Sequence, residues 1–191
     1  CRRSPRDKAI RAAVGELFER ARAEGVRLRP PAWLLPENLR DFEYVHAPEV
    51  PEGCPGGGGP GGERNLLVLL HGFGGRKEPF VELARSMRLP KTAVLVFDAP
   101  EELPEELVDE PPAYSWFTML DEDCEFIEPE PGENRRLDSL REAVEELADA
   151  LKMLTESVGW APEEIFLLGY GQGGTVALDF LLEPPAAAAA A

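Results

Sequence analysis

The sequence is poor in basic residues. Its 191 residues contain 36 Asp and Glu but only 20 Lys and Arg, which gives a formal net charge of −16. A molecule of this charge repels the phosphates of nucleic acid and of an anionic membrane surface, so we expect neither as a partner. The sequence also lacks an apolar run close to the roughly 20 residues that a membrane-spanning helix needs. These absences exclude classes of function without selecting one.

Cysteine is scarce as well. The three cysteines, Cys1, Cys54 and Cys124, form neither a C-x-x-C pair nor a disulfide-rich pattern, which favours a reducing compartment such as the cytoplasm or an organelle matrix. Because the chain begins at Cys1 rather than Met, we expect a start codon upstream. A targeting segment that is removed from the mature protein is an open alternative. The acidic run at 121–125, DEDCE, lacks the spaced ligands and glycine of an EF-hand loop, so no metal or cofactor is predicted.

What the sequence does contain is a set of continuous apolar runs. Residues 65–70, 92–97 and 165–168 have the character of strands buried on both faces of a parallel sheet. Helical spacing follows the first run at 78–87 and precedes the third at 139–158. This alternation predicts a parallel α/β sheet with helices on both faces.

Weaker signals surround these runs. Residues 6–24 show an amphipathic helical pattern that ends at Gly25, and residues 41–50 alternate as a half-buried edge strand. We expect the helix to pack on the domain or to dock on a partner. Ser139 opens an S-x-x-E sequence with Glu142, which predicts a capping box at the start of the long helix.

Three segments have unusual compositions. Residues 51–65 begin with a Gly/Pro-rich run that predicts a surface loop; the Lys and the Ser or Thr of a phosphate-binding loop are missing. Residues 98–134 are an acidic insertion without Lys or Arg, which favours a solvated loop or a docking surface for a basic partner, including the basic region at 1–30. The six alanines at 186–191 carry no pattern, so we interpret them as a tail of unassigned identity.

The stretch on which the functional interpretation depends is IFLLGYGQGGT, at 165–175. An apolar strand, a cluster of glycines and a helical pattern follow one another directly, as in a strand–turn–helix nucleophile elbow. Gly169 and Gly173 stand at the small positions of the G-x-S-x-G frame, and Gly174 follows. Gly171 occupies the position of the nucleophilic serine.

Further motifs precede this elbow in a familiar order. LLVLLHGFGG, then VFDAP, then the SWF of Ser115, Trp116 and Phe117, and finally LLGYGQGGTVAL extend over residues 65–182. In these motifs the chain resembles the phospholipase/carboxylesterase family of α/β-hydrolases, which includes the acyl-protein thioesterases. The resemblance implies a three-layer α/β-hydrolase-type fold over 26–185, with 1–25 as a separate N-terminal helix and the C-terminal strands missing.

The resemblance also implies a site. By the family pattern, the backbone N–H groups of Phe73 and Gln172 form the oxyanion hole. His71, Trp116 and Phe117 line a vestigial pocket that could hold an acyl ligand. For Trp116 and Phe117 the alternative is a place in the ordinary core.

The chain departs from the family at the residues that perform the chemistry. Glycine replaces the nucleophile, and the acid and base of this fold follow the elbow, whereas the 20 residues after Gly171 contain no His. The histidines of the chain, His46 and His71, both precede it. We therefore expect a catalytically inactive pseudoenzyme that serves as a structural or interaction subunit of a larger assembly. The alternative is an active carboxylester or thioester hydrolase whose catalytic residues lie outside this chain.

A last expectation concerns the strand at 165–168. In the family it lies inside the sheet, but no later strand exists in this sequence. Because a bare apolar edge is a template for aggregation, we expect further chain or a neighbouring subunit to cover it.

Overall fold

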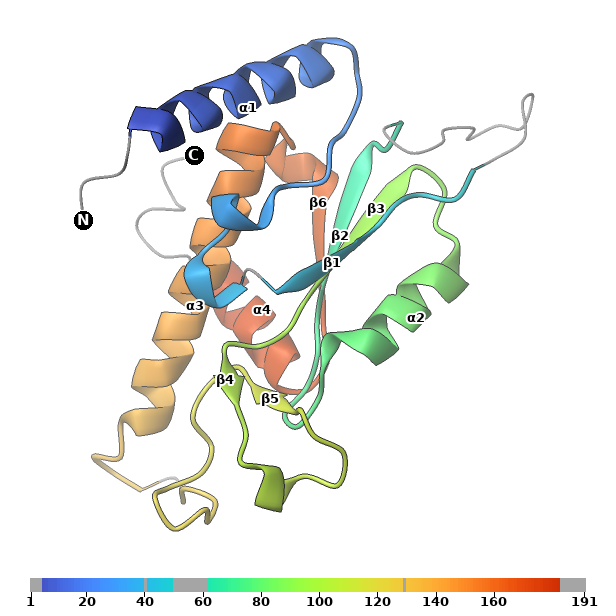
Figure 1. Cartoon of the computed structure of the whole chain (residues 1–191). Coiled ribbons are helices and arrows are strands. Elements are labelled where there is room, and N and C mark those ends of the chain that lie inside the picture. Colours follow the sequence, from blue (N-terminus) through green and yellow to red (C-terminus); the bar gives the residue numbers. More distant parts are fainter. Residues whose placement is uncertain (1–4, 40, 50–61, 129, 183–191) are drawn as a thin grey trace.

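The computed structural model describes residues 5–39, 41–49, 62–128 and 130–182, and its centre is a four-stranded sheet. The strands are β1 (Phe42–Val45), β2 (Asn65–Leu70), β3 (Thr92–Phe97) and β6 (Ile165–Gly169), in the spatial order β1-β3-β2-β6 (Figure 1). β2 is parallel to β3 and to β6, whereas β1 is an antiparallel edge strand. The predicted parallel sheet and edge strand are confirmed.

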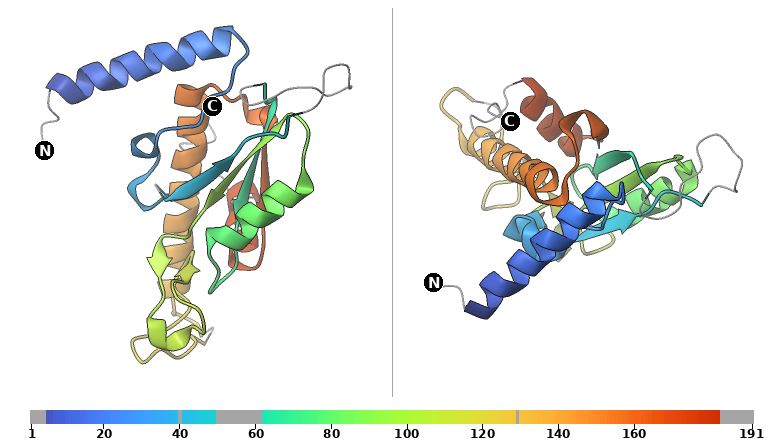
Figure 2. Two further views of the ribbon diagram at one scale, coloured as in Figure 1. Left: turned by 45° about the vertical axis from the view of Figure 1, so that its right-hand side comes forward. Right: turned by 90° about the horizontal axis from the view of Figure 1, so that it is seen from above.

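The sheet is the middle of three layers (Figure 2). α3 (Arg135–Met153) and α4 (Gln172–Leu182) cover one face, and α2 (Lys77–Met87) covers the other. Alternate residues of β2 belong to different cores: Val68 packs with the residues of α3, and Leu69 packs with those of α2. A strand buried on both faces needs this continuous apolar character, which is why 65–70 and 92–97 could be located without the structure.

The basic N-terminal segment forms α1 (Pro5–Ala23), which ends before Gly25 at φ +70° and lies across the C-terminal end of α3. Phe18 and Ala21 are buried, but Ile10 and Leu17 of the predicted apolar face are exposed. The acidic segment lies at the other end of α3 (Figure 1), so the described parts of the two segments do not meet within one molecule.

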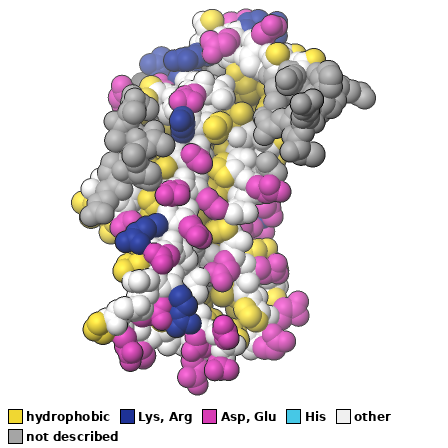
Figure 3. Space-filling model, turned by 90° about the vertical axis from the view of Figure 1, so that its left-hand side faces the viewer, with side chains coloured by type: hydrophobic (Ala, Val, Ile, Leu, Met, Phe, Trp, Pro, Cys, Tyr) yellow, Lys and Arg dark blue, Asp and Glu magenta, His cyan; other side chains and the backbone are white. Residues whose placement is uncertain are grey.

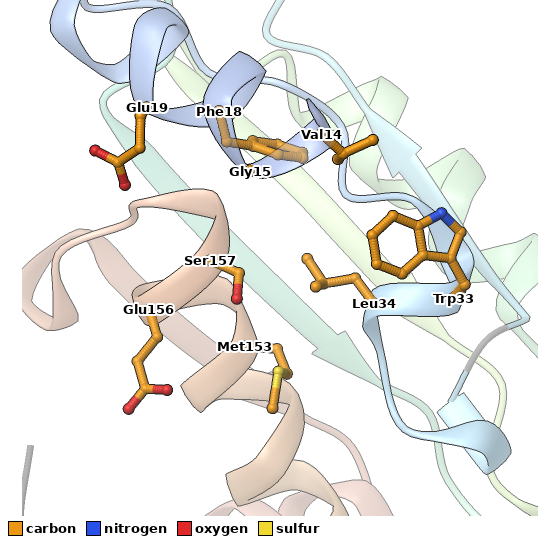
Figure 4. A pocket seen from close by; sticks show the side chains of 9 residues that line it. All are labelled: Val14, Gly15, Phe18, Glu19, Trp33, Leu34, Met153, Glu156 and Ser157. Carbon is orange, nitrogen blue, oxygen red and sulfur yellow. The ribbon is translucent and has the colours of Figure 1, made fainter. Parts of the chain in front are cut away.

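Contact between α1 and the domain is incomplete. A cavity of about 390 Å³ separates α1 from the short turn Ala32–Leu34 and from the end of α3 (Figure 4). Phe18, Trp33 and Met153 are among its lining residues, and Gly15 leaves it open on the side of α1.

The long helix differs from its prediction at both ends. α3 begins one turn earlier than expected, at Arg135, so Ser139 lies inside the helix and the predicted capping box is wrong. The Ser139 hydroxyl donates to the Arg135 carbonyl at 2.8 Å and accepts the Thr118 N–H at 3.0 Å. A hydroxyl inside a helix can bond to the carbonyl four residues earlier, an alternative that the S-x-x-E pattern does not reveal. At the other end, a π-helical turn (Leu154–Val158) continues the helix to Gly159.

The acidic segment is mostly exposed and contains a small hairpin of β4 (Glu101–Glu102) and β5 (Tyr114–Ser115). Carboxylates extend along the whole length of the face drawn in Figure 3. Most of the Gly/Pro-rich loop, the alanine tail, Cys1 and Cys54 lie outside the described residues. None of the described helices combines the length and the apolar character that a membrane span needs.

β6 is the second edge of the sheet. It pairs with β2 on one side, and no described strand pairs with it on the other. Phe166 and Leu168 point to the face of α2, but α2 packs on β1 and β3 and leaves them 51% and 40% exposed. The described residues therefore do not supply the cover that we expected for this strand.

Candidate functional site

The site is built on the abrupt turn between β6 and α4. A Cβ at Gly169 would lie 2.3 Å from the Gly173 carbonyl oxygen, and one at Gly173 would lie 2.5 Å from the carbonyl oxygens of Leu70 and His71. Strand and helix thus approach so closely that neither position has room for a side chain. The glycine spacing in the sequence reflects this close approach.

Gly171 lies at the tip of the turn, with φ +54° and an exposed backbone. A Cβ at this position would meet only the Cα of Gly72, at 3.4 Å, which is an ordinary contact. The left-handed backbone and the free space fit the tip of a strand–turn–helix elbow, and Gly171 places no side chain there.

The loop after β2 lies against this tip and offers backbone donors. The N–H of Gly74 donates to Tyr114 and that of Gly75 to Gly72, whereas the N–H of Phe73 has no acceptor among the described residues. The N–H of Gln172, at the N-terminus of α4, is also without an acceptor there. These are the two donors that the family resemblance implies for an oxyanion hole.

The side chain of Gln172 performs a task that the sequence did not reveal. It is buried, its Oε1 accepts the Trp116 N–H at 2.8 Å, and its Nε2 donates to the Phe117 carbonyl at 2.8 Å. The Ser115 hydroxyl lies 3.2 Å from Oε1 and 2.7 Å from the Phe117 carbonyl oxygen. Gln172 therefore ties the elbow to the SWF segment.

His71 is fully buried and both of its ring nitrogens are used. Nε2 accepts the Ala99 N–H at 3.0 Å, which requires an unprotonated nitrogen, and Nδ1 then carries the proton and donates to the Gly72 carbonyl at 2.8 Å. Burial lowers the pKa of His71, and the carboxylate of Asp98, 4.0 Å from Nε2, opposes this effect only in part. His71 joins the loops that follow β2 and β3 and is not available as a catalytic base.

Trp116 and Phe117 belong to the main hydrophobic core, with 2% and 7% of their surfaces exposed. Trp116 Nε1 donates to the His71 carbonyl at 2.8 Å. The structure thus favours the core over an acyl pocket for both aromatic rings. A cavity of about 120 Å³ beside this segment is lined by Phe73 and by residues of the acidic segment, including Ser115 and Met119.

Comparison with known proteins identifies the family. The model of a family described as Phospholipase/Carboxylesterase matches residues 59–190, which is more than half of the chain. The chain belongs to the phospholipase/carboxylesterase family. Its α/β-hydrolase fold agrees with this assignment.

Two curated relatives of this family member are uncharacterized hydrolases of fungi. One, from Mycosarcoma maydis, is 31% identical over 125 residues, which are 64% of this chain and 43% of that protein. The other, from Schizosaccharomyces pombe, is 30% identical over 114 residues, 60% of this chain and 44% of that protein. The chain spans less than half the length of these relatives.

Several solved structures are similar to part of the chain. Esterase PE8 is 28% identical to this chain; the match covers 62% of this chain and 51% of the esterase, with a TM-score of 0.48. Acyl-protein thioesterase 2 of Zea mays is 22% identical; the match covers 72% of this chain and 48% of the thioesterase, with a TM-score of 0.41.

A buried ion pair supports the site of this phospholipase/carboxylesterase homologue from the side of α2. The Asp98 carboxylate accepts the backbone N–H of Lys77 at 2.6 Å and its Nζ at 2.5 Å, and Asp41 lies 2.9 Å from the same Nζ. Burial lowers the pKa of Lys77, but the bonds to Asp98 and Asp41 outweigh it and raise the pKa above its usual value. Asp98 was expected among the solvated acids, and this was wrong. Its place at the carboxyl end of a buried strand was the available signal.

Proposed function

We propose that this chain is a catalytically inactive member of the family that acts as a structural or interaction subunit. The observation that carries the proposal is Gly171, which stands at the tip of an otherwise intact elbow. A serine hydrolase without its nucleophile keeps only the oxyanion hole and substrate binding, which together give about 10³–10⁴-fold over water.

The described side chains around the elbow offer no substitute for the missing groups. Ser115 is buried with its hydroxyl engaged, and His71 is buried with both nitrogens engaged. His46 follows β1 at the end of the sheet where β3 begins. The elbow follows β6 at the other end of the sheet, where β2 ends. A hydroxyl–imidazole pair of the kind that activates serine is therefore not available among the described residues.

The interaction part of the proposal is supported by an apolar surface beside the elbow, which we call the β6 surface. Its exposed members are Phe166, Leu168, Tyr170, Leu178, Leu181 and Leu182. Phe166 and Leu168 lie on the α2 face of the sheet and the three leucines lie on α4, so exposed apolar side chains flank the unpaired edge of β6 on both faces. An unpaired strand edge with exposed apolar residues beside it is typical of a protein contact site. We propose that further chain or a neighbouring subunit covers it.

An active hydrolase is the second candidate, favoured by the fact that the chain spans less than half of its curated relatives. In that case the acid and base lie outside this chain. Gly171 lies inside the matched region, however, so added residues would still have to provide a nucleophile at another position.

Reaction with a fluorophosphonate probe distinguishes the candidates. We expect no adduct on the folded chain, and the same measurement on the longer reading frame tests the second candidate. An adduct on a serine or threonine of the folded chain would overturn the proposal.

A further inference from the structure

A further pocket lies at the opposite end of the sheet from the elbow. It has a volume of about 250 Å³ and lies between the end of β1, the start of β3 and the C-terminal end of α2. We call it the His46 pocket. Its lining includes His46, Arg85 and Arg88 and the apolar side chains of Val45, Pro48 and Leu89.

The charge of this pocket is opposite to that of the molecule. The chain carries a net charge of −16, yet no Asp or Glu is among the residues that line the pocket. Arg85 and Arg88 are exposed, and neither has an ion-pair partner within the described ranges. Cations are common at a helix C-terminus, where they complement the carbonyl groups, so the two arginines alone would not indicate a ligand.

His46 is the independent observation. It comes from a different element, and its Nδ1 lies 2.9 Å from Oε1 of Glu63, whose side chain is fully buried. A carboxylate only accepts, so Nδ1 carries a proton and the ring orientation is fixed. Nε2 has no hydrogen-bond partner among the described residues, and 41% of the His46 side chain is exposed.

From these features we infer that the His46 pocket binds the phosphate group of a small organic phosphate monoester. The two guanidinium groups offer donors to several oxygens of one anion, and their two positive charges match a phosphate dianion better than a carboxylate. His46 lines the same pocket, and its Nε2 accepts when only Nδ1 carries a proton and donates when the ring is protonated at both nitrogens. The wall of Val45, Pro48 and Leu89 lies beside these donors and can contact the organic part of the ester. Nothing in this inference depends on the elbow or on the proposed loss of catalysis.

The two histidines of the chain make the test direct, because the Cε1–Hε1 region of a carbon–proton correlation spectrum contains one resonance for each. Phenyl phosphate titrated into the full chain at constant ionic strength should shift the His46 resonance saturably and leave that of buried His71 in place. Inorganic phosphate should bind at the same residue more weakly, since it lacks the organic body.

Matched variants separate a site from general attraction. Arg85→Gln and Arg88→Gln should each weaken phenyl phosphate binding about tenfold, because each removes a charge-assisted hydrogen bond. Arg141→Gln removes the same charge from α3, where Arg141 pairs with Asp138, and should leave the affinity unchanged. An unshifted His46 resonance, or equal losses in all three variants, would overturn the inference, and the His71 resonance reports that each variant is folded.

Discussion

Gln172 Oε1 accepts the backbone N–H of Trp116 at 2.8 Å, a bond that joins the first residue of α4 to a segment 56 positions earlier. The residue next to the nucleophile position thus holds the SWF segment through its side chain, whatever its backbone contributes. This bond therefore supports the shape of the elbow independently of any reaction there.

Gln172→Ala should therefore destabilise the fold by about 1–3 kcal/mol, because the buried N–H of Trp116 loses its acceptor. Urea unfolding followed by circular dichroism measures the loss. Gln172→Met is the matched control, since it keeps the volume and removes the same hydrogen bonds. If Gln172→Met were as stable as the original chain, packing rather than hydrogen bonding would be the role of this side chain.

The buried neutral state of His71 should make stability depend on pH. Because burial lowers the pKa of His71 in the folded chain, the unfolded chain binds a proton that the folded chain does not as the pH falls below about 6.5. Stability should therefore be complete above this pH and decline below it, by up to about 1.4 kcal/mol per pH unit.

The measurement is the free energy of unfolding by urea between neutral and mildly acidic pH, for the original chain and for His71→Gln. Glutamine can still accept the Ala99 N–H but does not titrate. The two pH profiles should diverge below the usual pKa of histidine, and parallel profiles would contradict the account of His71.

Two glycines of the N-terminal region should respond in opposite directions to alanine. Gly15 lies in α1, and a Cβ there meets no atom within 4 Å, so Gly15→Ala should stabilise the chain by about 0.5–1 kcal/mol. Gly25 ends the helix at φ +70°, so Gly25→Ala should destabilise it. Thermal unfolding of both variants checks the pair, and a loss of stability in Gly15→Ala would show that α1 does not pack as described.

Uncovered apolar residues on the β6 surface should make the isolated chain self-associate. Phe166→Lys combined with Leu168→Lys places charge on the exposed edge strand and should shift the chain toward monomer in light scattering after size exclusion. Glu142→Gln combined with Glu145→Gln, at exposed residues of α3, changes the net charge by the same amount and is the control for charge. An original chain that is already monomeric and binds no hydrophobic dye would contradict the proposed contact role.

The sheet could be predicted from the sequence because its signal is local. The runs at 65–70 and 92–97 coincide with β2 and β3. The run at 165–168 differs from β6 by one residue, because β6 ends at Gly169. The start of α3 was placed wrongly because a serine such as Ser139 fits both a cap and a helix interior, and here its hydroxyl donates to the Arg135 carbonyl one turn earlier.

The site was less accessible to sequence reasoning. The glycine frame indicated the turn because its spacing is local, although only the Gly169 contact, with Gly173, is close in sequence; Gly173 is required by the carbonyl groups of Leu70 and His71. The side-chain bonds that build the rest of the site join residues 17 to 57 positions apart. They are the bonds of Asp98 to Lys77, of Gln172 to the SWF segment and of His46 to Glu63. No periodicity in the sequence reports such pairs.

A serine hydroxyl introduced at Gly171 should not by itself produce ester hydrolysis. Space exists for a serine side chain at Gly171, so Gly171→Ser should fold. Without a base its ester hydrolysis should stay close to that of the original chain, since the loss of the base alone removes most of the rate enhancement of a triad. A large gain in the hydrolysis of short acyl esters would mean that an imidazole reaches the elbow.

Intact-mass measurement after reaction with a fluorophosphonate tests the central claim most directly. The folded chain should show no mass increase, because Gly171 has no hydroxyl and the Ser115 hydroxyl is buried. A stoichiometric adduct on any serine or threonine, formed by the folded chain but not by a chain unfolded before the reaction, would contradict the proposal that this chain is a pseudoenzyme.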